Sequence, residues 1–323
     1  MNISVAMATY NGERFLKEQL ESLASQTRMP DELVACDDRS TDRTVDILEQ
    51  FKRNAPFRIR TRKNNERLGY SKNFERAIGL CKGDIIFPSD QDDVWFPKKI
   101  ERIEKEFRSE NKPLVVINDC ELTDGNLNSS GFSKVDQIRS AGLSTRNFVS
   151  GCCTALHASM RPLIIPVPVD HSPYDVWINR LALALGKRQF VSDILQSYRR
   201  HHDNASEWFI SSTEPVNIID RFFRAARNWN DPRVSSKKRI DFMDIMIDRF
   251  QSRGPQLQNT PERRVDLQVA IKRARSEKVA AKRRLEVLNL PKPFRVIDAF
   301  RLWYKGAYEY FSGWKSMGKD IIA

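Results

Sequence analysis

Paired cysteines and long apolar runs are both missing from this sequence of 323 residues. No stretch approaches the roughly 20 uninterrupted apolar residues that a membrane-spanning helix requires. The five cysteines include no CxxC pair, so we expect no disulfide framework and no zinc site, and we expect the cysteines to be small buried apolar residues. The first residues also lack the basic region and apolar core of a signal peptide, and we therefore expect a cytoplasmic protein.

The positive charge is unevenly distributed along the chain. The net charge is +12, and the segment from residue 214 onward holds 24 Lys and Arg against 13 Asp and Glu. The first 213 residues are nearly neutral, with 30 basic residues against 29 acidic ones. Anionic partners such as lipid headgroups, sugar diphosphates or nucleic acid are therefore candidates for the C-terminal segment only.

Short apolar runs alternate with helical patterns in the first part of the chain. The apolar runs at 3–8, 32–36 and 84–87 and the alternating segment at 57–62 are typical of strands, and apolar residues spaced on one helical face lie between them. This alternation predicts an α/β fold with a doubly wound, mostly parallel sheet. In such sheets ligands bind beyond the carboxyl ends of the strands.

The pattern continues with fewer regular features. Residues 119–146 are polar and rich in Gly and Ser, which predicts a loop region with little helix. We expect a strand at 148–156, a helix at 174–185 and a last strand at 190–198, and helices beyond residue 214.

Carboxylates cluster where two of the expected strands end. Asp37 and Asp38 follow the second strand, and Asp90, Asp92 and Asp93 follow the fourth. Three carboxylates within four residues would repel one another unless a cation lay among them, and oxygen ligands of this hardness suit Mg²⁺ or Mn²⁺. A helix-capping turn is the alternative interpretation of the first cluster, and a solvated turn with Asp93 as a helix cap is that of the second.

Seven segments in a fixed order resemble glycosyltransferase family 2, which has the GT-A fold, and within it the bacterial rhamnosyltransferase-like subgroup. The segments are SVAMATYNGERFLKEQLESLASQT, DDRSTDRT, LGYSKNF, SDQDDVWFPKKI, SGCCTAL, YDVW and YRRHHDN. The resemblance covers residues 1 to about 205. It implies a GT-A catalytic domain at 1–213, followed by a basic helical region at 214–323.

The resemblance implies a nucleotide site at the first two strand ends. Thr9 and Tyr10 would line the pocket, and Asp38 would accept a hydrogen bond from a pyrimidine N–H with Asp37 beside it. The family often has Gly at the position of Arg39, so the turn here departs from the family pattern.

Further donor contacts follow from the same resemblance. Arg67 and Lys72 would meet the ribose or a phosphate, although surface cations of this kind are usually only solvated. Asp90 and Asp92 correspond to the DxD pair, with Asp92 as the metal ligand and Asp90 facing the ribose or the metal shell. His201 would contact the metal or the diphosphate.

The implied diphosphate and catalytic groups lie later in the chain. Arg199 would neutralise phosphate charge beside His201. Asp175 would be the general base that an inverting transfer needs, and Tyr174 stands where the family usually has His. A first-turn helix carboxylate stabilised by the helix dipole is the alternative for Asp175.

The acceptor is expected near Gly151, Cys152 and Trp177. A glycine allows a ligand to approach the backbone, and a tryptophan can stack on a sugar. Simple packing of a small-residue strand and a buried core tryptophan are the alternatives for these positions.

The basic C-terminal region is not covered by the resemblance. Aromatic residues alternate with Lys and Arg between Phe294 and Lys315, which suits an interfacial helix on anionic lipid of the cytoplasmic face of the inner membrane. A helical pair that packs on the catalytic domain or forms a homo-oligomer is the alternative.

Together these observations predict an inverting glycosyltransferase that depends on Mn²⁺ or Mg²⁺. The resemblance implies a nucleotide-sugar donor, with L-rhamnose from dTDP-L-rhamnose first and UDP-hexoses second, and a glycan or lipid-linked acceptor in surface polysaccharide synthesis such as O-antigen or capsule. A nucleotidyltransferase of similar fold would have a Gly-rich phosphate loop after the first strand, where this chain has Thr9-Tyr10-Asn11-Gly12. A nucleic-acid or membrane-binding module would explain the basic segment but not an acidic cluster at each strand end, and we expect no nucleic-acid partner.

Overall fold

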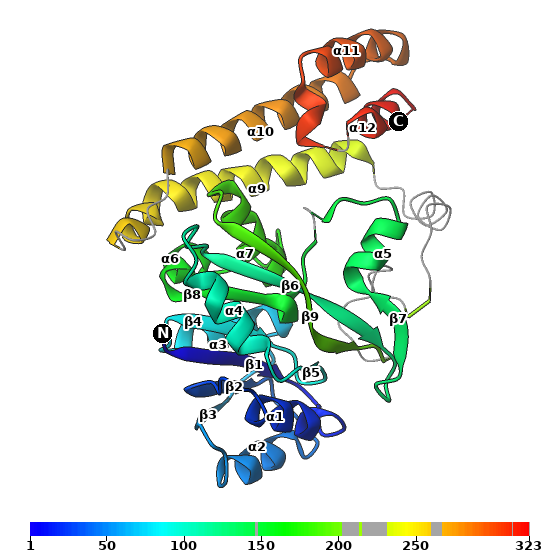
Figure 1. Ribbon diagram of the computed structural model, residues 1–323. Coiled ribbons are helices and arrows are strands. Elements are labelled where there is room, and N and C mark those ends of the chain that lie inside the picture. Colours follow the sequence, from blue (N-terminus) through cyan, green and yellow to red (C-terminus); the bar gives the residue numbers. More distant parts are fainter. Residues whose placement is uncertain (146–147, 202–212, 215–230, 260–266, 312, 323) are drawn as a thin grey trace.

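A mixed nine-stranded sheet forms the centre of the protein in the computed structural model (Figure 1). The strands are β1 Ile3–Thr9, β2 Glu32–Asp37, β3 Arg58–Lys63, β4 Ile85–Ser89, β5 Val94–Trp95, β6 Val115–Thr123, β7 Ser129–Ser133, β8 Thr154–His157 and β9 Arg188–Arg199. The structure describes residues 1–145, 148–201, 213–214, 231–259, 267–311 and 313–322.

The strand order is β3-β2-β1-β4-β8-β6-β9-β5, with β7 paired to β6. Strands β3, β2, β1 and β4 are parallel, as the sequence predicts, and β6 is parallel to β9. Strand β8 enters between β4 and β6 and is antiparallel to both. The prediction of an α/β sheet is therefore confirmed, and the parallel arrangement is concentrated in its N-terminal half.

Two buried clusters cover opposite faces of the parallel strands. Val5 and Met7 belong to one cluster, whereas Ala6 belongs to the other, because successive side chains of a strand point to opposite faces. The helices before residue 200 are α1 Leu16–Ala24, α2 Thr44–Lys52, α3 Tyr70–Leu80, α4 Lys99–Phe107, α5 Lys134–Ser140, α6 Arg161–Ile164 and α7 Tyr174–Ala184. Because both faces of these strands are buried, the sequences of β1, β2 and β4 are mostly apolar.

The expectation of a loop at 119–146 is wrong over much of its length. Strand β6 runs to Thr123, and β7 and α5 follow it. The start of α5 is fixed by a capping box, in which the Ser133 hydroxyl accepts from the Asp136 amide and the Asp136 carboxylate accepts from the Ser133 amide. At 148–156 the expected strand begins only at Thr154, after a 3₁₀ turn at Gly151–Cys153.

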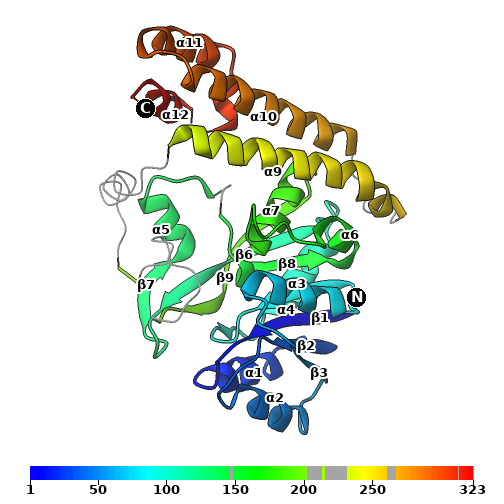
Figure 2. The ribbon, with the colours of Figure 1, turned by 180° about the vertical axis from the view of Figure 1, so that it is seen from behind.

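The C-terminal helices are α9 Pro232–Arg253, α10 Leu267–Leu288, α11 Lys292–Tyr304 and α12 Trp314–Ile322. Of these, α9 and α10 lie next to the part of the chain that contains the sheet, and α11 and α12 lie beyond them (Figures 1 and 2). Phe242, Met246 and Phe250 of α9 join the buried cluster that contains Trp177 of α7. Each such side chain contributes roughly 1.5–3 kcal/mol by its burial. Helix α9 is therefore part of the main core, whereas the far half of α10 forms a separate small core with α11 and α12.

The expected domain boundary at residue 213 lies between two segments, 202–212 and 215–230, that are outside the described residues. In the described ranges no helix has both the length and the apolarity to cross a bilayer. All five cysteines are buried and unpaired with one another, as expected.

Candidate active site

A cleft of about 1550 Å³ opens beyond the carboxyl ends of β1, β2 and β4. This is the edge at which the two acidic clusters of the sequence meet. Its described lining includes side chains from the strand ends, from α3 and α7, and from the C-terminal helices: Thr9, Tyr10, Arg14, Phe15, Asp38, Arg67, Asp90, Asp92, Lys134, Gly151, Tyr174, Asp175, Arg180, His201, Arg239, Tyr310 and Lys319.

One end of the cleft is built around Asp38. Its carboxylate accepts hydrogen bonds from the Asn64 side chain at 2.8 Å and from the amides of Leu68 and Gly69 at 2.7 and 2.8 Å. A carboxylate has about four acceptor positions, so one remains for a ligand. These bonds also fix the 68–69 turn, where Gly69 has a φ of 78° that favours glycine.

A flat cationic surface lies next to this carboxylate. The guanidinium of Arg67 stacks on the ring of Tyr10, 3.9 Å from its centroid. Both residues line the cleft, as does Thr9 at the end of β1. Arg39 adopts a φ of 66°, which explains why glycine is common at this turn in similar sequences.

Gln91 attaches the acidic turn to the end of β1. Its side chain accepts from the Tyr10 amide and donates to the Tyr10 carbonyl, both at 2.9 Å. The carboxylates on either side, Asp90 and Asp92, both line the cleft. Burial, together with the neighbouring charges of Asp92 and Asp175, raises the pKa of Asp90 to about 7.

His201 completes the acidic turn from a distant part of the chain. Its Nε2 lies 2.8 Å from Oδ2 of Asp92. Adjacent ligands of a divalent ion at about 2.1 Å lie about 3 Å apart, so these two atoms fit one coordination shell. The carboxylate oxygen of this pair suits Mn²⁺ or Mg²⁺, and the imidazole is a nitrogen ligand for transition ions.

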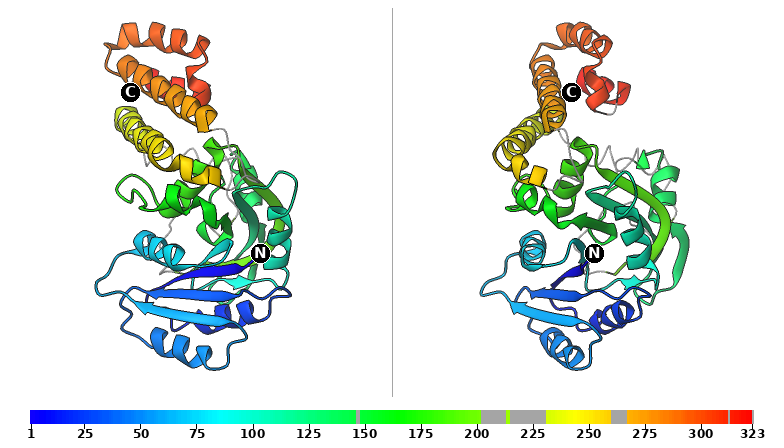
Figure 3. Two further views of the ribbon diagram at one scale, coloured as in Figure 1. Left: turned by 90° about the vertical axis from the view of Figure 1, so that its left-hand side faces the viewer. Right: turned by 60° about the vertical axis from the view of Figure 1, so that its left-hand side comes forward.

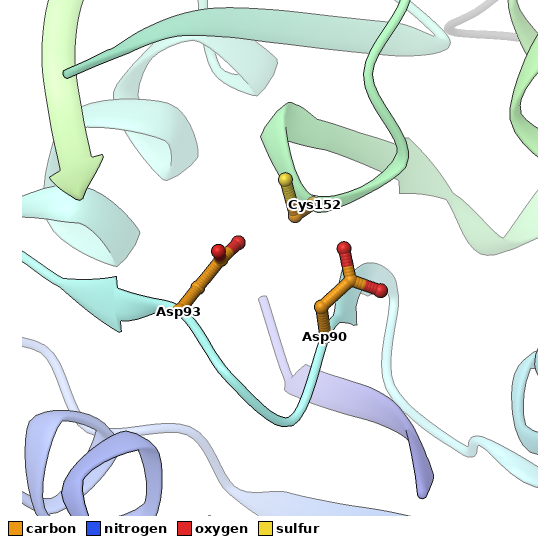
Figure 4. A group of neighbouring side chains, drawn as sticks. All are labelled: Asp90, Asp93 and Cys152. Atoms are coloured by element: carbon orange, nitrogen blue, oxygen red, sulfur yellow. The ribbon is translucent and has the colours of Figure 1, made fainter. Parts of the chain in front are cut away.

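A second group of potential ligands combines two carboxylates of the acidic turn with the Cys152 thiol. Asp90, Asp93 and Cys152 bring one ligand atom each to within 4.8 Å of one another (Figure 4). The Asp93 carboxylate already accepts from the Gln196 side chain and the Arg199 amide. Burial raises the pKa of the Cys152 thiol well above its ordinary value, which keeps the thiol protonated. This group fits a hard cation less well than the set with Asp92 and His201.

Asp175 faces the acidic turn from the first turn of α7. It lines the cleft, and its Oδ1 accepts from the Val176 amide at 2.8 Å. Burial raises the pKa of Asp175, and that amide and the charge of Lys134 offset only part of the rise. A carboxylate with a raised pKa is a better proton acceptor than an ordinary aspartate.

Tyr174 and Gly151 form a tight contact beside Asp175. The Tyr174 ring stacks on Phe74 with centroids 4.3 Å apart. A Cβ atom added to Gly151 would lie 2.0 Å from the Tyr174 hydroxyl. Gly151 is therefore required for this part of the cleft to close around the Asp175 carboxylate.

Comparison with known proteins agrees with this geometry. Residues 4–161 match the family model "Glycosyl transferase family 2". Residues 4–161 form a glycosyl transferase family 2 domain.

The names of two proteins that are similar to this chain describe glycosyltransferases. The chain is 28% identical over 215 residues to an uncharacterized glycosyltransferase, alr2836, of Nostoc sp., covering 63% of this chain and 66% of that protein. It is 42% identical over 98 residues to the dTDP-rhamnosyl transferase RfbG of Shigella flexneri, covering 29% of this chain and 34% of that protein. The chain thus spans between a third and two thirds of the length of these two relatives.

A solved structure has the same fold as the whole chain. The crystal structure of S. aureus TarS 1–349 in complex with UDP aligns with a TM-score of 0.54 at 17% identity, covering 100% of this chain and 88% of that one. At this identity the likeness shows the fold, which is that of the GT-A glycosyltransferases.

Several residues that the sequence predicted at the site lie elsewhere. Trp177 is fully buried and its indole N–H donates to the Ile164 carbonyl, so it packs in the core and does not reach an acceptor. Asp37 is occupied by hydrogen bonds from Thr9 and Ser40. Neither is among the described residues that line the cleft.

Lys72 and Cys152 also depart from their expected positions. Lys72 pairs with Glu75 at 2.9 Å, outside the described lining of the cleft. Cys152 is buried, and its carbonyl accepts from the Lys99 ammonium at 2.7 Å. Packing within the family 2 domain accounts for both side chains.

Arg199 supports the acidic turn from behind. Its side chain donates to the carbonyls of Asp92 and Gly125, both at 2.8 Å, and forms an ion pair with Glu18. It is 2% exposed and is absent from the described lining of the cleft. The arginine that was expected to bind phosphate thus holds a metal-ligand candidate in place. The rest of the YRRHHDN segment, 202–204, lies outside the described residues.

Sequence reasoning missed several cleft residues of the family 2 domain and its helical extension. Lys134 is buried, donates to the Ser150 hydroxyl at 3.1 Å and favours the ionised forms of Asp90 and Asp175. The Ser133-x-x-Asp136 capping box was the available signal for the helix that carries it. No local signal placed Arg239 or Tyr310 at the cleft, because they arrive there through packing of α9 and η7 (Ala307–Tyr310).

Proposed function

We propose that this protein is an inverting, metal-dependent glycosyltransferase that moves a sugar from a nucleotide-sugar donor to a glycan or lipid-linked acceptor in bacterial surface polysaccharide synthesis. One observation carries the proposal. A single cleft contains a polar end at Asp38, an acidic turn with an imidazole, and a carboxylate of raised pKa at Asp175.

The nucleoside would bind at the end formed by Tyr10, Asp38 and Arg67. The remaining acceptor position of Asp38 suits the imide N–H of uracil or thymine, which a purine does not offer in the same place. Arg67 is held flat by its stack on Tyr10 and can offer N–H donors to the ribose or a phosphate.

Asp90, Asp92 and His201 would hold the divalent cation. When bound, Mn²⁺ or Mg²⁺ supplies positive charge that stabilises a nucleoside diphosphate as a leaving group. Gln91 and Arg199 act through the backbone, since Gln91 fixes the turn to β1 and Arg199 holds the Asp92 carbonyl. This support keeps the carboxylates in place before the donor arrives.

Asp175 would accept the proton of the acceptor hydroxyl. The acceptor oxygen then forms a bond to the anomeric carbon while the bond from that carbon to the diphosphate oxygen breaks, with inversion at the carbon. Gly151 lies next to Asp175, where the absence of a side chain lets the Tyr174 hydroxyl pack against the backbone. Lys134 keeps Asp175 ionised by its charge.

For the donor we infer dTDP-L-rhamnose, because the chain is 42% identical over 98 residues to the dTDP-rhamnosyl transferase RfbG. A UDP-hexose is the alternative, since the structure of TarS with the same fold contains UDP. Asp38 suits either pyrimidine, so the sugar contacts must decide between them.

The test measures the thermal stability of the protein with dTDP-L-rhamnose, UDP-Glc, UDP-Gal or UDP-GlcNAc, each in the presence of Mn²⁺ and in the presence of EDTA. We expect donor-dependent thermal stabilisation that requires the cation and one preferred pyrimidine donor. A purine donor such as GDP-mannose serves as the control. Absence of cation-dependent binding for every pyrimidine donor would refute the proposal.

A further inference from the structure

One face of α11 exposes apolar side chains that nothing in the described chain covers. Helix α11 buries Arg295, Ala299 and Leu302, which lie three and four positions apart on one side. The opposite side carries the aromatic face, which we define as Phe294, Val296, Ile297, Phe300, Trp303 and Tyr304. Each is at least 38% exposed, and Tyr304 is 89% exposed.

The aromatic face lies at the outer end of the molecule. Figures 1 and 3 show α11 at the end opposite α2, beyond α9 and α10. Contiguous apolar patches of this kind on soluble domains mark protein-binding or membrane-binding surfaces. Charge distinguishes between these two possibilities.

A second cavity, the basic groove, adjoins this face. It has a volume of about 910 Å³ and lies between α10 and the turn after α11. Lys272, Arg275, Arg283 and Lys305 line it, and Tyr304 belongs to both the groove and the aromatic face. Within the described ranges, no ion pair is formed by any of these four cations. Glu309 also lines the groove, so the four cations leave an excess of positive charge there, which attracts anions.

The charge of the surrounding helices has the same sign. Residues 267–322 contain 13 Lys and Arg against 5 Asp and Glu. Asp298, the one acidic residue of α11, is paired with Arg301 at 3.0 Å. Trp and Tyr beside basic side chains are the composition that binds at the boundary between headgroups and acyl chains.

We propose that the aromatic face and the basic groove bind the surface of an anionic phospholipid bilayer. The aromatic side chains would enter the interface, and Lys272, Arg275, Arg283 and Lys305 would contact headgroup phosphates. Each basic residue near such a surface contributes attraction that salt screens. This inference does not depend on which sugar the cleft transfers.

The test is flotation of the full chain with vesicles of phosphatidylcholine alone and of phosphatidylcholine with phosphatidylglycerol. We expect binding to the anionic vesicles only, and weaker binding as the salt concentration rises. Equal binding to both vesicles, or no binding to either, would overturn the proposal. Inorganic phosphate at millimolar concentration should not displace the protein, whereas displacement would indicate a site for a soluble phosphate compound.

Two variants test the two parts separately. The variant K272Q/R275Q/R283Q should lose about two orders of magnitude in affinity for anionic vesicles. The variant F300Q/W303Q/Y304Q should lose binding even at low salt. Matched controls change exposed residues elsewhere, K63Q/K98Q/K105Q for charge and M29Q/I194Q/V234Q for apolar surface, and should bind like the wild type.

The variants also separate this proposal from others. Donor binding at the cleft should survive in both, because none of the substituted residues lines the described cleft. If the aromatic variant instead converts a dimer to a monomer in light scattering while vesicle binding is unchanged, the face is an interface between copies and the proposal fails. If the aromatic variant aggregates, the charge variant alone decides the result.

Discussion

The imidazole of His201 lies against the carboxylate of Asp92, with Nε2 2.8 Å from Oδ2, although 109 positions separate the two residues. Strand β9 makes this contact possible, because it pairs with both β6 and β5 and delivers its carboxyl end to the acidic turn. The Arg199 side chain then fixes the Asp92 carbonyl from the same strand.

From this contact we expect that His201→Ala lowers kcat roughly 10²–10³-fold, the loss typical of removing one electrostatic stabiliser of a transition state. Asp92→Asn should behave similarly. Mn²⁺ affinity, measured by calorimetry with a pyrimidine nucleoside diphosphate present, should fall in both variants. Cys152→Ser is the matched control and should bind Mn²⁺ normally. The opposite pattern would place the cation between Asp90, Asp93 and Cys152.

Asp175→Asn should reduce transfer about 10²–10⁴-fold, the contribution of a general base. Donor binding, followed by thermal shift, should be retained. Asp170→Asn, an exposed neighbour, should have full activity. An Asp175→Asn protein with wild-type turnover would remove the assignment of the base.

The pH profile of the wild type should report the same carboxylate. Burial raises the pKa of Asp175, and only the ionised form accepts a proton, so the rate should fall as the pH decreases through that raised value. The fall should begin at a higher pH than an ordinary aspartate would give. A rate that stays constant down to about pH 4 contradicts the assignment, because that is the range of an unperturbed aspartate.

Gly151→Ala should impair both folding and transfer. The added Cβ would lie 2.0 Å from the Tyr174 hydroxyl and 2.8 Å from its Cζ, so the stacked ring must move. We expect a loss of about 1–3 kcal/mol in the free energy of unfolding. The double variant G151A/Y174F removes the closest contact and should recover part of that loss. Gly318→Ala has no atom within 4 Å of the new Cβ and should be neutral or slightly stabilising.

Glu32→Gln should destabilise the sheet in a pH-dependent manner. Burial by itself raises the pKa of Glu32, but hydrogen bonds from Ser4, the Lys82 amide and Arg60 outweigh it and hold the pKa below 4.5. The stabilisation is therefore present above pH 4.5 and disappears as the pH falls through the lower folded value. At pH 7 the variant should lose roughly 1.5–3 kcal/mol, the range for hydrogen bonds to a charged group.

Urea unfolding of Glu32→Gln and wild type at several pH values measures this difference. The gap between the two proteins should close in strong acid. Glu110→Gln, at an exposed position, should show no gap at any pH. A gap that stays constant down to strong acid would mean that packing and not charge explains the loss.

Much of the parallel half of the sheet could be predicted from the sequence. Strands β1, β2 and β4 are short apolar runs that end in polar turns, β3 is an edge strand rich in arginine, and helices with one apolar face separate the four strands. The same pattern placed Asp38, Asp90 and Asp92 at the carboxyl ends of strands, where the cleft is. Local pattern suffices there because each strand and the turn that follows it can be recognised from neighbouring residues.

Other site residues could not be assigned in this way. Trp177 and Asp175 are two positions apart in one helix, and only packing decides that Trp177 enters the core while Asp175 faces the cleft. Arg199 and His201 are likewise two positions apart, yet the first supports the turn and the second lines the cleft. A motif gives the order of residues but not the direction of each side chain.

The sequence by itself determined the alternation of strands and helices, the two acidic strand ends and the concentration of positive charge after residue 214, because these depend on neighbouring residues and on composition. Only the tertiary structure decided that β8 runs against its neighbours, that α9 completes the main core, and that α11 exposes its aromatic face beside the cations of the basic groove. Those outcomes depend on contacts between segments that are far apart in the chain, where the free energy of burying one surface is set by which other surface reaches it.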